Sequence, residues 1–327
     1  MKRPLAARLL LAALLLAGSP GAIAEPPGAP PGVSDPWLPD WRSWFGPRDR
    51  PATPATMHLQ TAVARGDAGQ VQRMLDAGID PNGLGDGRDT PLQIAVMNGR
   101  SDLARVLLEH GADPGLSARD SPESPLHLAM RERDESMARL LLEYGAPLEA
   151  SVPRAMGTPF DHIGDTPLHM AAETGETGLT SLLLGYGANP DAGNRAGLTP
   201  LHHAVGAGQL KVATQLLAEG AALEPRSRIG ATPLHWAVVQ GQTAAAQLLI
   251  ERGAEVNTRT RNGSTPLHSA AARNEPDLVA LLLEHGADPK VVGLRGETPL
   301  ALARRQGHPD VIRLLESGTE STRSLSD

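Results

Sequence analysis

The sequence predicts an all-α solenoid, and three observations support this fold class. A hexapeptide close to TPLHxA recurs along the chain, for instance as TPLHMA from Thr166 and TPLHWA from Thr232. The seven copies begin at Thr90, Ser124, Thr166, Thr199, Thr232, Thr265 and Thr298. All steps but the second are about 33 residues long, and self-similarity at such a period is typical of stacked repeats. Aromatic residues make up only 2% of the chain. The apolar content is therefore mostly alanine and leucine, which suits close contacts between regular helices.

Residues 1–24 have the features of a secretory signal peptide. Three basic residues accompany a short apolar run at residues 9–17, and an A-x-A pattern ends at Ala24. The apolar run is too short for a standard membrane span. We therefore expect cleavage after Ala24 and a periplasmic or secreted protein. The alternative is an uncleaved anchor.

The composition excludes several classes of function. The chain has no cysteine, so it has no disulfide, thiolate metal site or thiol nucleophile. After removal of the signal peptide, 27 basic residues face 37 acidic ones, which is a formal charge of −10. This balance disfavours general nucleic-acid binding.

A proline-rich segment at residues 25–54 is expected to form an extended linker. It contains Trp37, Trp41 and Trp44 close together. This tryptophan-rich segment could pack on the first repeat as a cap, contact a partner or a membrane surface, or be disordered. Tryptophan favours interfaces, which is why membrane contact is retained among the alternatives.

Each repeat combines the signals for two helices. A Thr or Ser is expected to cap a helix whose first residue is proline, and inward residues such as Leu234 and Ala237 follow. A short break, often with glycine, leads to a second helix that carries a leucine pair. That helix is expected to end at a left-handed glycine. The terminating glycines are Gly78, Gly111, Gly145, Gly187, Gly220, Gly253, Gly286 and Gly318.

This pattern resembles the ankyrin repeat, with GADP or GAEVN following the second helix. The resemblance covers residues 55–318 and implies eight units with hairpin fingers between them. The first unit lacks the Thr-Pro pair at the expected position and is predicted to be an N-terminal cap. The eighth unit has a polar outer side and is predicted to be a C-terminal cap. Residues 319–327 are expected to form a disordered tail.

Two departures from the family pattern concern the third unit. Arg133 stands where a glycine is expected between the helices, as does Asn274 in a later unit. Arginine tolerates a left-handed backbone less well than asparagine, so the third unit is expected to turn differently. Nine extra residues lie between Gly145 and Thr166. They should make one finger protrude, exposing Met156 and Phe160.

The repeated histidines are predicted to be structural. Each is expected to bond to the turn of its own repeat, and equivalent positions in a stack lie about 10 Å apart, too far for metal convergence. They are His127, His169, His202, His235 and His268. No HExxH, GxSxG, P-loop or GxGxxG motif occurs. We therefore expect no enzyme activity, no metal, no cofactor and no small-molecule substrate.

Arginines at the finger positions are the strongest candidates for partner binding. Arg195, Arg228 and Arg261 recur with the period of the repeat and should stack as a ladder, with Arg226 and Arg259 as a second set. Guanidinium groups in a row suit a carboxylate-rich protein surface. The alternative is an ordinary solvated surface. Trp236 is expected to reach the inner face of the stack.

The prediction is a non-catalytic protein-binding module that is exported to the periplasm and inhibits or stabilises a partner protein. The alternative is a secreted effector that binds host proteins through the same surface. The third hypothesis is a role as an accessory domain of an enzyme, and no residues support it.

Overall fold

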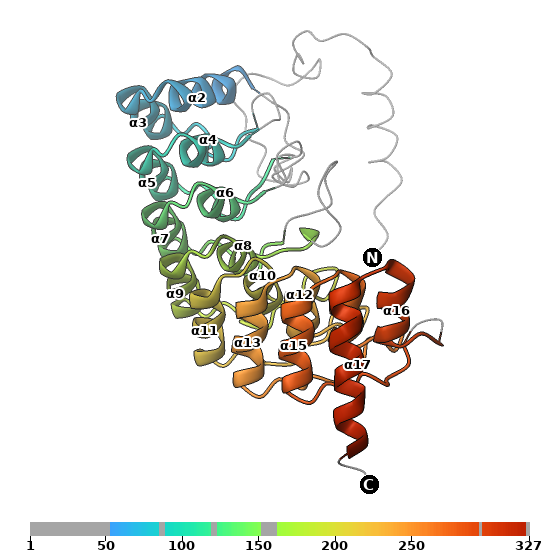
Figure 1. Ribbon diagram of the computed structural model, residues 1–327. Coiled ribbons are helices and arrows are strands. Elements are labelled where there is room, and N and C mark those ends of the chain that lie inside the picture. The colour runs from blue at the N-terminus through green and yellow to red at the C-terminus, as the bar shows by residue number, and fades with distance from the viewer. Residues whose placement is uncertain (1–52, 85–88, 119–122, 152–161, 294–295, 325–327) are drawn as a thin grey trace, which may run out of the picture. The chain divides into compact units, whose positions relative to one another are not determined.

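The computed structural model describes residues 53–84, 89–118, 123–151, 162–293 and 296–324, all within one compact unit, Gly46–Asp327. Within these ranges the chain forms sixteen α-helices in eight consecutive pairs (Figure 1). The first helices of the pairs are α2 (Pro54–Arg65), α4 (Pro91–Met97), α6 (Pro125–Arg131), α8 (Pro167–Thr174), α10 (Pro200–Gly206), α12 (Pro233–Val239), α14 (Pro266–Ala272) and α16 (Pro299–Gln306). The second helices are α3 (Ala68–Asp76), α5 (Ser101–Glu109), α7 (Glu135–Glu143), α9 (Thr177–Gly185), α11 (Leu210–Ala218), α13 (Thr243–Glu251), α15 (Pro276–Glu284) and α17 (Pro309–Ser324). The predicted eight helix pairs are confirmed.

Local sequence explains where the first helices begin. Each has a Thr or Ser in extended conformation at its N-cap and a proline in its first turn, as at Thr90 and Pro91. Thr90 accepts from the amide of Gln93 through its hydroxyl, and the Gln93 side chain accepts from the Thr90 amide. This reciprocal pair satisfies two amides that the helix cannot satisfy itself.

The core runs through the stack because equivalent helices of neighbouring units contact one another. Helix α10, for example, packs against α8, α12 and its own partner α11. Leu234 and Ala237 are 1% and 0% exposed, which confirms their predicted inward position. The small alanine side chain allows the close approach of neighbouring helices. Each unit thus buries its apolar face mainly against its neighbours.

The third unit turns as the others do, contrary to the expectation from Arg133. Arg133 has a φ of 55° and Asn274 a φ of 59°, close to the 71° of Gly241 in another unit. All three residues occupy the left-handed region between the two helices of a pair. Arginine therefore accepts at this position a conformation that costs about 1–2 kcal/mol in residues with a Cβ atom.

The two ends of the array differ from the prediction. Thr53 and Pro54 supply the Thr-Pro cap of α2, so the pair is present in the first unit but lies about one turn earlier than in the others. At the other end, α17 does not stop at Gly318 but continues to Ser324. The expected C-terminal stop and a disordered tail beginning at residue 319 are therefore wrong for residues 319–324.

The last unit has the polar outer side expected of a cap. Arg304 and Glu316 form an ion pair of 2.7 Å between α16 and α17, and both side chains are about half exposed or more. In the part of the chain that the structure describes, every helix is too short or too polar to cross a membrane. The signal-like sequence and the tryptophan-rich segment lie outside the described residues.

Candidate functional site

The fingers that carry the predicted arginines are joined through their backbones. The amide of an arginine in each finger donates to a carbonyl of the preceding finger at 2.8–2.9 Å. These bonds are Arg195 to Ile163, Arg228 to Ala196 and Arg261 to Ile229. The three arginine side chains are exposed. The backbone bonds hold the three fingers in register, so the Cα atoms of these arginines recur with the spacing of the repeat. We call Arg195, Arg228 and Arg261 the arginine ladder.

Arg226 and Arg259 have a different role from the ladder. Arg226 donates through Nη1 to the carbonyl of Arg259 at 3.0 Å. Arg259 donates through Nη2 to the carbonyl of Val292 at 2.6 Å. Each side chain therefore ties its finger to the next one and satisfies a backbone carbonyl there. Both residues are also exposed, and their role in partner binding stays a prediction.

An exposed isoleucine adds an apolar contact to the ladder. Ile229 follows Arg228 in the chain and is 62% exposed, more than any other large apolar side chain among the described residues. Its carbonyl receives the amide of Arg261, which places it between two ladder positions. The sequence analysis did not identify it, although an isoleucine at the tip of a polar finger was a usable signal. Met156 and Phe160 lie outside the described residues and stay predictions.

Trp236 packs within the stack. A Cβ atom added at Gly206 would lie 2.5 Å from the Trp236 ring, so the indole covers this glycine of the preceding unit. Trp236 is only partly exposed. The glycine supplies the space that the ring needs, and the expected position of Trp236 on the inner face stays a prediction.

The repeated histidines join neighbouring units as well as their own turns. The Nδ1 atom of His235 accepts from the Thr232 amide at 3.3 Å, and Nε2 lies 3.3 Å from the carbonyl of Ser264 in the next unit. A proton on Nε2 satisfies both bonds. Equivalent Nε2 contacts link His127 to Asp165, His169 to Leu198, His202 to Ala231 and His268 to Glu297. The structural role is confirmed, but the prediction of a bond confined to one repeat was incomplete.

Burial keeps these histidines neutral. Desolvation lowers the pKa of His235 to about 4, because the charged imidazolium loses its water. The same cause lowers the pKa of His127 to about 4. In the second unit, Gln93 replaces histidine and makes matching bonds to the Thr90 amide and the Glu123 carbonyl, both at 2.8 Å. A neutral side chain with one acceptor and one donor is therefore what the position requires.

A polar cluster that the sequence analysis missed lies between α8 and α10. It consists of His162, Asp165, Glu173, Asn194 and His203. Asp165 is 2% exposed and lies 2.9 Å from Nδ1 of His162, while Asn194 donates to its other oxygen at 2.7 Å. Burial opposes ionisation of Asp165, but the hydrogen bond from His162, the electrostatic interactions with His203 and His169 and the hydrogen bond from Asn194 together hold the pKa of Asp165 below its ordinary value.

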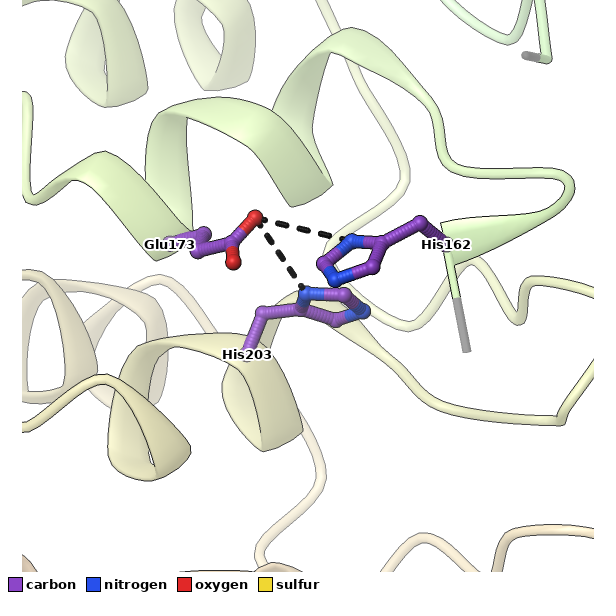
Figure 2. A group of neighbouring side chains, drawn as sticks. All are labelled: His162, Glu173 and His203. Atoms are coloured by element: carbon purple, nitrogen blue, oxygen red, sulfur yellow. Dashed lines mark ion pairs between the residues drawn. The ribbon is translucent and has the colours of Figure 1, made fainter. Parts of the chain in front are cut away.

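The histidine rings of this cluster face Glu173 (Figure 2). Glu173 Oε2 lies 3.6 Å from Nδ1 of His162 and 4.0 Å from Nδ1 of His203. His203 belongs to this cluster, whereas its neighbour His202 contacts Thr199 and Ala231. The two adjacent histidines in the sequence were the available signal for the cluster.

The comparisons with known proteins agree with this architecture. A family model described as "Ankyrin repeats (3 copies)" matches residues 59–152, 152–227, 168–260 and 234–324. Cyclin-dependent kinase 4 inhibitor B of Mus musculus is 45% identical over 56 residues, which are 17% of this chain and 42% of that protein. The 2-5A-dependent ribonuclease of Mus musculus is 47% identical over 57 residues, which are 17% of this chain and 8% of that protein. The chain thus spans less than half the length of these curated relatives.

Among solved structures, the ankyrin repeat domain of Bcl-3, described as a unique member of the IkappaB protein family, is similar. Its TM-score is 0.59 at 32% sequence identity, and the match covers 70% of this chain and 98% of that chain. The repeats matched over residues 59–324, together with this likeness in fold, show that the chain belongs to the ankyrin repeat family.

Proposed function

We propose that the chain is an exported, non-catalytic module that binds another protein and thereby inhibits or stabilises it. Ankyrin repeat domains typically bind proteins and are typically non-catalytic. One relative is, by its name, an inhibitor of a kinase. The signal-like sequence at residues 1–24 supports export, with the periplasm as the expected destination.

The arginine ladder is the observation that carries this proposal. The three arginines are exposed and lie on fingers that backbone bonds hold in register, so the spacing of the ladder is set before any partner arrives. An arginine can bind a carboxylate with two parallel hydrogen bonds. The exposed Ile229 beside them supplies an apolar anchor. The partner that fits this surface is a protein with a carboxylate-rich patch around an apolar pocket.

Partner capture from a periplasmic extract tests the proposal. The mature protein from Glu25 is compared with a ladder variant that combines Arg195→Ser, Arg228→Ser and Arg261→Ser. Each charge-assisted hydrogen bond contributes about 1.5–3 kcal/mol, so we expect the variant to bind the captured protein at least about tenfold more weakly. The loss should shrink at high salt, because salt screens exposed charges. Ile229→Ala should weaken binding at every salt concentration.

A control variant with the same loss of charge separates the ladder from net charge. It combines Arg73→Ser, Arg105→Ser and Arg252→Ser, which change exposed arginines on or just after second helices. Equal weakening by both variants would mean that net charge, and not the ladder, drives binding. Wild-type affinity in the ladder variant would place recognition elsewhere on the chain.

The export part of the proposal has a separate test. Expressed with residues 1–24 in a bacterial host, the protein should appear in the periplasmic fraction with an intact mass that begins at Glu25. A membrane-bound species that keeps the signal-like sequence would show an anchor instead.

A further inference from the structure

The polar cluster between α8 and α10 contains three side chains that suit a metal ion. The ligand atoms of His162, Glu173 and His203 all lie within 4.8 Å of one another. His162 comes from the turn that leads into α8, Glu173 from the last turn of α8 and His203 from α10 (Figure 2). Three residues from three separate segments thus meet at one point.

The distances are close to those of a metal site. Metal–ligand bonds of about 2.0–2.2 Å in a tetrahedron place neighbouring ligand atoms about 3.4 Å apart. Glu173 Oε2 lies 3.6 Å from His162 Nδ1 and 4.0 Å from His203 Nδ1. His162 Nδ1 also lies 2.9 Å from Asp165 Oδ2, and the three ligand atoms lie within 4.8 Å of one another. Binding an ion therefore requires His162 to exchange its contact with Asp165 and the side chains to approach one another by up to about 1.4 Å.

The surrounding side chains orient the ligands. Asp165 Oδ1 lies 3.4 Å from Nε2 of His203, and the side chain of His203 is only 5% exposed. A proton on Nε2 would face this carboxylate and leave the lone pair of Nδ1 for a metal ion; the amide nitrogen of Asn194 also lies 3.4 Å from Nε2. A histidine held by a carboxylate in this way is the usual support of a metal ligand. The side chains of His162 and Glu173 are 30% and 43% exposed, so an ion can reach the site from solvent.

The repeat scaffold does not explain these residues. One repeat further along the chain, the positions that correspond to His162, Glu173 and His203 are occupied by Arg195, Gly206 and Trp236. The stack folds with those residues in the next unit, so helix packing requires neither the imidazoles nor the carboxylate. By contrast, His169 and His202 recur with the period and have their scaffold bonds.

We propose that His162, Glu173 and His203 bind one divalent transition-metal ion, with zinc as the best fit. Two imidazole nitrogens and one carboxylate oxygen form a donor set that zinc accepts in tetrahedral geometry, leaving a fourth position for water or a donor from a partner. The bound ion ties the turn before α8 to α8 and α10. This site departs from the expectation of no metal.

Zinc titration of the tag-free mature protein, stripped of metal with a chelator, tests the site. We expect one zinc per chain by elemental analysis, micromolar or tighter affinity in competition with a zinc indicator, and a higher thermal midpoint with zinc. His162→Gln and Glu173→Gln, which change partly exposed side chains, should each weaken binding at least tenfold. Asp165→Asn should weaken it by about 10–100-fold, as expected for a residue that orients a ligand. The exposed His285 provides the control, and His285→Gln should bind zinc as wild type does.

Cobalt spectroscopy provides a readout that does not depend on how the variants fold. Wild-type protein loaded with Co²⁺ should show the visible absorption bands of a four-coordinate ion, and these should disappear when zinc is added. The proposal is overturned if the wild type takes up no stoichiometric zinc. Equal binding by the wild type, His162→Gln and Glu173→Gln would also overturn it.

Discussion

The histidine contact between units can be tested by changing His235 in two ways. His235→Ala removes the acceptor for the Thr232 amide and the donor for the Ser264 carbonyl. Thr232 is fully buried, so its amide would be left without this partner. Two lost hydrogen bonds and one unpaired buried group together cost about 2–4 kcal/mol. His235→Gln should cost less than about 1 kcal/mol, because Gln93 makes the same two bonds in the second unit.

Acid should distinguish the glutamine variant from the wild type. The folded protein holds the pKa of His235 at about 4, against 6.5 when the side chain is unperturbed. Between these values the unfolded chain binds the extra proton, so the free energy of unfolding falls as pH falls. The contribution of neutral His235 to the free energy of unfolding is fully present above about pH 6.5 and is lost progressively towards pH 4. At about pH 5.5 the wild type has lost about 1.4 kcal/mol of its free energy of unfolding through this proton. The His235→Gln variant has no imidazole at this position and does not show this loss.

Urea denaturation followed by circular dichroism at about pH 7.5 and about pH 5.5 measures both effects. At the higher pH the free energy of unfolding of the glutamine variant should be close to that of the wild type. At the lower pH it should exceed the wild-type value, relative to that comparison, by about 1.4 kcal/mol. Hydrogen exchange should show the alanine variant opening around residues 232–264. If glutamine is as damaging as alanine at the higher pH, the imidazole contributes packing that the two hydrogen bonds do not describe. If the pH dependence of the glutamine variant matches that of the wild type, His235 is not the group that titrates.

Three further predictions concern packing and backbone. Gly206→Ala should cost about 1–3 kcal/mol in urea denaturation because its Cβ atom would meet the Trp236 ring, whereas Gly185→Ala, with nothing within 4 Å, should stabilise α9 by about 0.5–1 kcal/mol. The reverse order would contradict the packing. Arg133→Asn should stabilise by up to about 1 kcal/mol, since φ is 55° there and asparagine accepts this conformation more readily; a lower thermal midpoint would argue against strain. Leu249→Ala should cost about 2–5 kcal/mol, and hydrogen exchange should locate the loss in neighbouring units, whereas uniform unfolding would indicate a tightly coupled stack.

The local signals in the sequence determined the helices and their order. These signals are the Thr-Pro pairs, the inward leucine and alanine residues and the left-handed glycines. Each acts on residues close to it in the chain, so the sequence of one repeat is enough to predict the two helices of that repeat. The constant period then requires that equivalent residues stack. The same reasoning failed at Arg133, because stacking by both neighbours imposes a left-handed turn that arginine does not favour by itself. It also failed at Gly318, where the sequence signal for a stop does not end α17.

Only the tertiary structure decided what the polar side chains do. Arg226 and Arg228 are close neighbours in one finger, yet Arg226 binds a carbonyl of the next unit while Arg228 is on the exposed ladder. Spacing cannot distinguish them, because the direction of a side chain in a turn depends on the neighbouring finger. The cluster of His162, Glu173 and His203 draws on three segments and has no period. Such convergence depends on contacts between units, and the sequence pattern of a single repeat does not predict these contacts.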